Sequence, residues 1–258
     1  MAVSDLVKTI VKNDGRLLNI IEFVESKKHL NIKLYPVQRV IFKLIYGIPL
    51  SDDISDDPII LKDDFNEVIL YTFTSEIEFV EFLVSEKKLN SSDIIDPMEV
   101  LFFVGRRGTK TTMISMMVSY TIYVILEIGN PHEYFGIVLQ SEIGIAVVSN
   151  KTSNASKQLR EISNMVYGSK YFSEYIVSKE PSKEGFFMKT KYGKNNPDKR
   201  VGLINIQVFA ATPSVRGSSN IVVVLDEFAH YIDSDNPQRL CLLTKKFMKL
   251  SLLQSLVS

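Results

Sequence analysis

Hydrophobic residues in the first fifty positions recur every three or four residues, the spacing of one helix face. The pattern predicts helices over 6–11, 18–24 and 36–44, the last beginning at a proline, which a first helical turn tolerates. Residues 51–66 hold six aspartates against one lysine, and we interpret them as a solvated acidic loop. The hydrophobic spacing returns over 76–88 and predicts another helix.

Beyond residue 90, short apolar runs alternate with helical patterns. The long apolar pattern over 111–128 predicts a buried helix, and Gly129-Asn130-Pro131 is expected to end it. Residues 179–200 contain seven basic and three acidic residues, and we interpret them as an exposed hairpin or loop. Runs with the length and β-branched content of buried strands lie at 98–104, 144–149, 201–211 and 221–226.

This alternation predicts an α/β fold with a mostly parallel sheet, helices on both faces and a helical N-terminal lead-in. A helix that carries Leu159, Ile162 and Val166 should follow the second strand. Ser153 or Asn154 is expected to cap that helix, because their side-chain oxygens accept hydrogen bonds from its first backbone N–H groups.

Composition bounds the class of protein. The 258 residues are 45% hydrophobic with a formal net charge of zero. The net charge therefore indicates neither that the protein binds nucleic acid nor that it does not. Cys241 is the single cysteine, which excludes an intrachain disulfide and fits a reducing compartment. His29, His132 and His230 form no Cys/His cluster of the zinc-binding kind. No signal-peptide pattern or membrane-spanning run is found, so we expect a soluble intracellular protein.

A glycine-rich turn follows the first predicted strand and leads into the long helix. In a phosphate-binding loop of this architecture, backbone N–H groups and the helix N-terminus surround the phosphates. Lys110 would reach the β- and γ-phosphates, and the Thr111 hydroxyl would bind Mg²⁺. Gly105 and Gly108 each lie one position from the usual glycine sites, and Thr109 stands where a glycine normally precedes the lysine.

Thr109 is the main departure from the usual loop. A β-branched residue disfavours the positive φ that glycine adopts at this point. Either Gly108 takes the special conformation, or the loop is reshaped and binds phosphate less tightly. The alternative interpretation is an ordinary strand–turn–helix junction.

Two adjacent carboxylates, Asp226 and Glu227, stand at the end of the last predicted strand. Ligands of open α/β sheets bind at the carboxyl ends of the strands. Asp226 is suited to hold Mg²⁺, and Glu227 to polarise a water that attacks a phosphate. The alternative is a solvated acidic turn, but the pair and Lys110 would complement each other by flanking one Mg²⁺-nucleotide.

Four segments form a motif set along the chain. They are Lys33-Leu34-Tyr35-Pro36-Val37-Gln38, Gly105-Arg106-Arg107-Gly108-Thr109-Lys110-Thr111, Ala146-Val147-Val148-Ser149-Asn150, and Ser214-Val215-Arg216-Gly217-Ser218-Ser219-Asn220 running into Asp226-Glu227-Phe228-Ala229-His230. Over about residues 30–235 they resemble the ATPase domain of the large terminase subunit of tailed bacteriophages, the motor that packages DNA. The last segment is the most specific.

The resemblance implies a P-loop NTPase fold of the additional-strand, catalytic-glutamate type and Mg²⁺-dependent ATP hydrolysis. Glu227 would be the catalytic carboxylate, Arg106 would sense the γ-phosphate, and Arg216 would act as an arginine finger on a neighbouring subunit. Thr111 and Asp226 would bind the metal. The implied ATP-binding residues are Tyr35, Gln38, Gly105, Arg107, Gly108, Thr109, Lys110, Thr111 and Thr112.

The resemblance also implies a helical, adenine-recognition region over 1–90, an ATPase core over 91–235 and an atypical tail over 236–258. The family's coupling segment and nuclease domain are not evident, so we expect a chain truncated before the nuclease and without nuclease activity. The implied partners are double-stranded DNA, a small terminase subunit, a portal protein and further copies in a ring, in the host cytoplasm and without a membrane.

Two other functions stay open. Helicase-like nucleic-acid ATPases also pair a glutamine segment with a phosphate loop and an Asp-Glu strand. A degenerate nucleotide-binding or assembly module without robust turnover would account for Thr109. Contact between the basic residues of 179–200 and DNA is less favoured than an exposed loop, and His230 is interpreted as a packing or surface residue.

Overall fold

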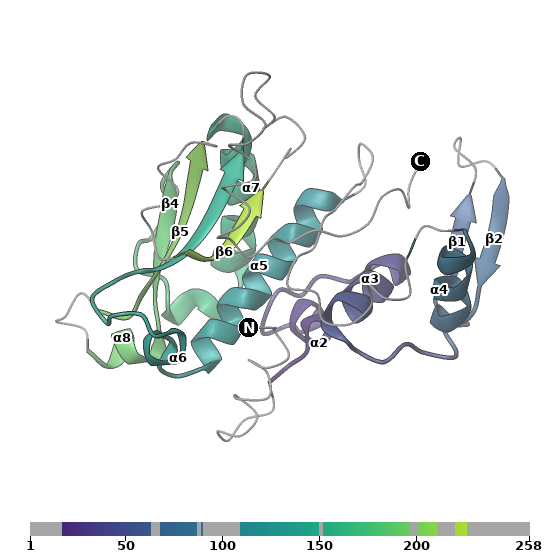
Figure 1. Cartoon of the computed structure of the whole chain (residues 1–258), viewed down its shortest axis with the longest axis horizontal. Helices are drawn as coiled ribbons and strands as arrows, with labels where there is room; N and C mark the ends of the chain where they lie inside the picture. The colour runs from purple at the N-terminus through teal and green to yellow at the C-terminus, as the bar shows by residue number, and fades with distance from the viewer. Residues whose placement is uncertain are drawn as a thin grey trace.

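The computed structural model is a mixed α/β protein with a mostly parallel sheet (Figure 1). The elements predicted at 6–11 and 98–104, His230 and the tail from 236 lie outside the part that the structure describes. The described residues are 17–62, 68–86, 89, 109–149, 152–196, 201–210 and 220–225.

Two helices open the described chain. α2 spans Ile20–Glu25 and begins with a capping box: Asn19 Oδ1 accepts from the backbone N–H of Glu22 at 3.0 Å, and Glu22 Oε2 accepts from that of Asn19 at 3.0 Å. α3 spans Pro36–Tyr46 and ends at Gly47, whose φ of 61° suits glycine. Both helix predictions for this region are confirmed.

A β-hairpin and a helix follow α3. β1 (Ile59–Lys62) pairs antiparallel with β2 (Ile69–Phe73), and α4 spans Glu76–Ser85, which confirms the helix predicted here. The prediction of an acidic loop over 51–66 is wrong for residues 59–62, which form β1. Ile59 is buried with residues of α4, so a short apolar pair within the aspartates is enough to hold a strand.

The central sheet has the strand order β4-β5-β3-β6. β3 (Ile143–Ser149) lies between β5 (Leu203–Ala210) and β6 (Asn220–Leu225) and is parallel to both. β4 (Gly185–Lys189) pairs antiparallel with β5 at one edge. The three parallel strands confirm the sequence predictions for them.

β4 corrects the interpretation of residues 179–200 as an exposed hairpin or loop. Phe186 and Met188 alternate along the strand and are buried in the main core. The segment continues into a short helix, α8 (Lys191–Asn195). The lysines dominate the composition, but a strand needs only every second residue to be apolar in order to pack one face.

Helices connect the strands of the sheet. The long helix predicted over 111–128 is confirmed, and none of the helices in the described ranges is long and apolar enough to span a membrane. The cap predicted at Ser153 or Asn154 is wrong, because the helix already begins at Thr152 and both residues lie in its first turn. α5 (Lys110–Glu127) and α6 (Pro131–Phe135) precede β3, and α7 (Thr152–Gly168) and the 3-10 turn η2 (Phe172–Glu174) lie between β3 and β4.

The two faces of the sheet carry separate hydrophobic clusters. Ile145 and Val147 of β3 join α5, α7 and β5 in the main core. Ala146 and Val148, which point the other way, form a small cluster with Val223 of β6. Within the described ranges α5 and α7 belong to the main core, and the helical cover of the second face stays a prediction.

α3 lies between two hydrophobic cores. Its Phe42 and Ile45 side chains are buried in the main core with α2 and α5. Val40 and Leu44, on another side of the helix, are buried with the β1–β2 hairpin and α4 in a second core. One helix therefore joins the hairpin region to the sheet.

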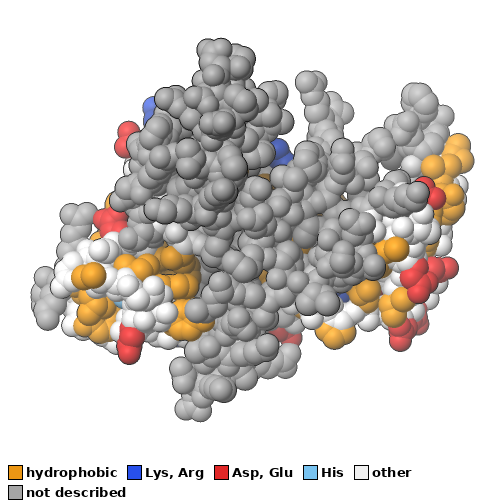
Figure 2. All heavy atoms as spheres, in the orientation of Figure 1, with side chains coloured by type: hydrophobic (Ala, Val, Ile, Leu, Met, Phe, Trp, Pro, Cys, Tyr) orange, Lys and Arg blue, Asp and Glu red, His pale blue; other side chains and the backbone are white. Residues whose placement is uncertain are grey.

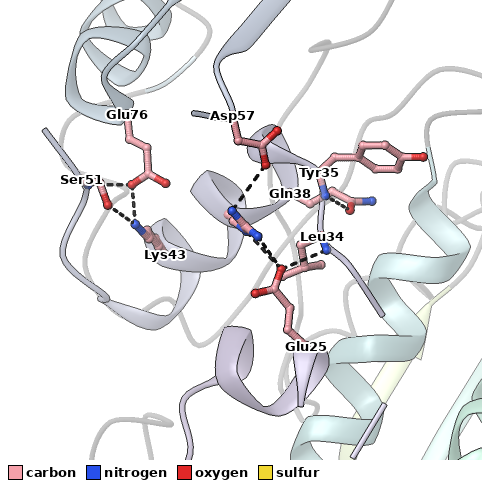
Figure 3. Close-up of polar contacts among 9 residues, drawn as sticks. Glu25, Leu34, Tyr35, Gln38, Lys43, Ser51, Asp57 and Glu76 are labelled. Carbon is pink, nitrogen blue, oxygen red and sulfur yellow. Dashed lines mark hydrogen bonds and ion pairs between the residues drawn. The ribbon is translucent and has the colours of Figure 1, made fainter. Parts of the chain in front are cut away.

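Ion pairs fix α3 in this position (Figure 3). Lys43 Nζ lies 2.5 Å from Glu76 Oε2 at the start of α4, and the two side chains are only 12% and 4% exposed. The same carboxylate oxygen accepts from the backbone N–H of Ser51 at 2.7 Å. On the α2 side, Arg39 Nη2 lies 2.7 Å from Glu25 Oε1.

Candidate nucleotide-binding site

The structure describes one part of the predicted site. Tyr35 and Gln38 at the start of α3, and residues 109–112 at the start of α5, belong to this part. The predicted site residues that lie outside the described ranges are Gly105, Arg106, Arg107, Gly108, Arg216, Asp226 and Glu227.

Gln38 joins the two described segments. Its Nε2 donates to Thr109 Oγ1 at 3.1 Å, and its Oε1 accepts from the backbone N–H of Tyr35 at 3.0 Å. The side chain is buried, with the residue 6% exposed, and both ends of the amide are committed to protein groups. Among the residues that the structure describes, one N–H and one oxygen lone pair of the amide have no partner and could serve a ligand. Two segments 71 residues apart in the chain are thus in direct contact.

Tyr35 presents an aromatic surface beside this contact. The residue is 69% exposed, and Figure 3 shows its ring projecting away from α3. Its backbone is held by Gln38, so the ring is attached to a fixed point while its faces stay accessible. An exposed aromatic ring of this kind can stack on a nucleobase.

Thr109 takes up the conformation that a glycine would normally supply. It precedes α5 with φ 55° and ψ 14°, in the left-handed region. For a β-branched residue this costs about 1–3 kcal/mol and persists only where the surroundings enforce it. The hydrogen bond from Gln38 is one such restraint. Thr109 itself therefore adopts the left-handed conformation, and Gly108 lies outside the described residues.

The first turn of α5 is anchored by α7. Gln158 Nε2 donates to the backbone carbonyl of Thr111 at 3.0 Å and to Ser115 Oγ at 2.7 Å. Ser115 Oγ donates in turn to the Thr111 carbonyl at 2.9 Å. Gln158 is 1% exposed, so these bonds are made in a dry environment where they orient the turn firmly.

Sequence reasoning missed Gln158. It lies on the hydrophobic stripe of α7 with Ala155, Leu159 and Ile162, all of them buried. A polar side chain on a buried stripe needs a partner, and that mismatch is the signal that could have found it. The identity of the partner was not readable from the sequence, because it comes from another helix.

The start of α5 lies at the carboxyl edge of the sheet. α7 begins three residues after β3 ends, and its Gln158 contacts Thr111, so the two helix starts are close to that edge. β6 ends at the same edge, with Leu225 paired to Val148. Figure 1 shows the N-terminal end of α5 on the side to which the strand arrows point. This edge is the usual ligand position of an open α/β sheet.

The arrangement suits an anionic ligand. The first-turn N–H groups of an eighteen-residue helix carry partial positive charge, and Lys110 is the first residue of that helix. Tyr35 and Gln38 stand beside the same helix start. A ligand with an aromatic base at one end and phosphates at the other would meet both features.

A double-mutant cycle tests the Gln38–Thr109 contact. Gln38→Leu and Thr109→Ala are each expected to lower the free energy of unfolding by about 1–3 kcal/mol. The double variant should lose about 1 kcal/mol less than their sum, because both changes remove the same hydrogen bond. Urea unfolding measures all four proteins. A cycle of Thr109→Ala with Asn19→Ala, at the distant cap of α2, should be additive, and additivity in both cycles would contradict the contact.

No protein-family model matches the sequence, and no curated protein matches it either.

Proposed function

We propose that the chain is an Mg²⁺-dependent ATPase domain of the kind found in large terminase subunits that package viral DNA. The observation that carries the proposal is the hydrogen bond from Gln38 to Thr109. It links the Tyr35–Gln38 segment to the start of α5, the two segments that the motif set assigns to base and phosphates. The P-loop type of the α/β fold is part of this proposal.

In the proposed complex the nucleotide spans these segments. The base stacks on the exposed Tyr35 ring, and the remaining hydrogen-bonding capacity of Gln38 meets its edge. The β- and γ-phosphates lie at the start of α5, where first-turn N–H groups donate to phosphate oxygens and Lys110 contributes its charge. The conformation of Thr109 lets the backbone turn toward the phosphates as glycine does.

Thr111 fits a role as a Mg²⁺ ligand. Its carbonyl is occupied by Gln158 and Ser115, while its hydroxyl makes no hydrogen bond to any residue of the described ranges. A hydroxyl and a carboxylate are oxygen ligands of the kind that Mg²⁺ takes beside phosphates. Thr111 and Asp226 would hold the ion, which neutralises phosphate charge when bound.

The remaining roles follow from the motif set. Glu227 orients the attacking water and accepts its proton. Arg106 senses the γ-phosphate from the same chain, and Arg216 reaches the γ-phosphate of a neighbouring copy. Turnover would be coupled to movement of double-stranded DNA, with a small terminase subunit, a portal protein and further copies of the chain as partners.

Calorimetric titration of the full chain with a non-hydrolysable ATP analogue and Mg²⁺ tests the proposal. Lys110→Ala is expected to weaken binding at least about tenfold, because a hydrogen bond from a charged group contributes about 1.5–3 kcal/mol. Lys62→Ala, which removes an exposed lysine of β1, is the matched control and should bind like the wild type. Equal affinities for all three proteins would contradict the assignment. Binding without steady turnover in the wild type would favour a nucleotide-binding module over a motor.

A further inference from the structure

The β1–β2 hairpin, with Val68 just before β2, carries five of the nine exposed large hydrophobic residues among those that the structure describes. Ile60 on β1 and Ile69, Leu70 and Tyr71 on β2 are about half exposed, and Ile77 of α4 lies in the same region. Figure 2 shows hydrophobic side chains over this hairpin. Ile60 and Leu70 share the face of the hairpin away from the buried Phe73, and exposed apolar surface of this kind marks an interaction site.

β2 also has the character of an unprotected edge strand. Its sequence Ile69-Leu70-Tyr71-Thr72-Phe73 contains no charge, proline or glycine, and only Phe73 is buried. Among the described residues β2 pairs with β1 alone, in a sheet of two strands. An edge of this kind presents backbone N–H and C=O groups that an added strand can bind.

The surroundings of the edge are strongly acidic. Residues 37–86 contain three basic and eleven acidic residues, a net charge of −8 in a chain whose total is zero. Figure 2 shows acidic side chains beside the hydrophobic ones, over α4. The exposed acidic residues of the described ranges here are Asp52, Asp53, Asp56, Glu78, Glu81 and Glu86.

The negative charge of residues 37–86 determines which class of partner can bind at the β2 edge. Nucleic acid is repelled, since its backbone is anionic. A second copy that paired β2 with β2 would bring two regions of charge −8 together, which also opposes association. A basic segment is attracted, and apolar residues alternating with its basic ones would cover the exposed side chains of the hairpin.

We propose that the β2 edge binds an extended segment of a partner protein in which lysine or arginine alternates with aliphatic residues. The segment adds a strand to the β1–β2 sheet. Its aliphatic side chains pack on Ile60 and Leu70, which share the face of the hairpin away from α4, and its basic side chains point to the opposite face, that of Tyr71 and the carboxylates of α4. The proposal is independent of nucleotide binding.

Fluorescence anisotropy with labelled peptides tests this surface on the full chain. A short peptide that alternates lysine with valine is expected to bind, to weaken as salt rises, and to protect residues 69–73 from hydrogen exchange. A peptide of the same composition with all lysines at one end, and one that alternates glutamate with valine, should bind much less. Equal binding of all three peptides would overturn the proposal.

Surface variants locate the site. Leu70→Lys, at a residue 55% exposed, should weaken the lysine–valine peptide at least about tenfold, with the urea midpoint unchanged. Val138→Lys, at an exposed hydrophobic residue between α6 and β3, is the matched control and should have no effect. A triple variant should also weaken peptide binding, although its apolar residues are unchanged; it combines Asp52→Asn, Asp56→Asn and Glu81→Gln. Unchanged affinity in Leu70→Lys, or self-association of the chain through β2 in place of peptide binding, would overturn the proposal.

Discussion

Glu227→Gln is expected to reduce steady-state ATP hydrolysis by about 100- to 10,000-fold, the range that general-base catalysis contributes. Glutamine has nearly the same volume but cannot accept the proton of an attacking water. Mg²⁺-ATP affinity should stay close to that of the wild type, because the proposed contacts of Lys110 and Thr111 with the phosphates and metal are retained. Phosphate release in a coupled assay, with calorimetry in parallel, measures both quantities.

Glu81→Gln is the matched control for this experiment. It makes the same chemical change on the exposed surface of α4, on the hairpin side of α3. Its turnover should equal that of the wild type. If the Glu227 and Glu81 variants hydrolyse ATP at the same rate, Glu227 is not the catalytic carboxylate, whatever the result for Lys110.

Lys43→Met is expected to lower the free energy of unfolding by about 3–5 kcal/mol, because it leaves the buried carboxylate of Glu76 without its cation. Methionine retains the apolar stem of the lysine, so packing is nearly preserved. Among the described residues, the backbone N–H of Ser51 alone would still serve the carboxylate oxygen that now contacts Lys43. Urea unfolding at neutral pH measures the loss.

Two further variants separate charge from packing in this pair. Lys43→Met combined with Glu76→Gln should recover much of the lost stability, since no buried charge remains. Lys194→Met breaks the exposed ion pair with Glu174 and should cost no more than about 1 kcal/mol. A Lys43→Met loss as small as that of Lys194→Met would show that the carboxylate is solvated rather than buried.

The elements that the sequence predicted well are those with high apolar content. β3 and β6 were predicted as strands from short apolar runs, β5 from apolar residues that alternate with Asn205 and Gln207, and α5 from its long apolar run. In these segments the local pattern and the tertiary environment favour the same structure. The apolar content of these segments was therefore sufficient to predict them.

Three strands were missed, β1, β2 and β4, and the first and last of these have the opposite character. β1 lies among aspartates and β4 among lysines, and each is held by a few buried side chains such as Ile59 and Phe186. Both stand at the edge of their sheet, where one face of the strand is exposed or only partly buried. Averaged composition hides a strand that packs with every second residue.

The segments of the candidate site were predictable from the sequence, but the contacts between these segments were not. The loop was recognised from its spacing and the glutamine segment from the family resemblance, but the bond between Gln38 and Thr109 joins residues from different parts of the chain. The role of Gln158 at Thr111 likewise depends on how α7 packs against α5. The left-handed backbone of Thr109 opposes its own residue preference, and only the folded environment selects it.

The position of α3 has a mechanical consequence. One eleven-residue helix carries the hydrogen bond to Thr109 near its first turn and the ion pair to Glu76 near its last. Close-packed cores on two of its sides resist deformation. We therefore expect the helix to move as a rigid body, so that a displacement of one end also displaces the other end. A shift of the Thr109 turn when phosphate arrives would tilt the β1–β2 hairpin, and strain applied at the hairpin would reach the turn along the same path.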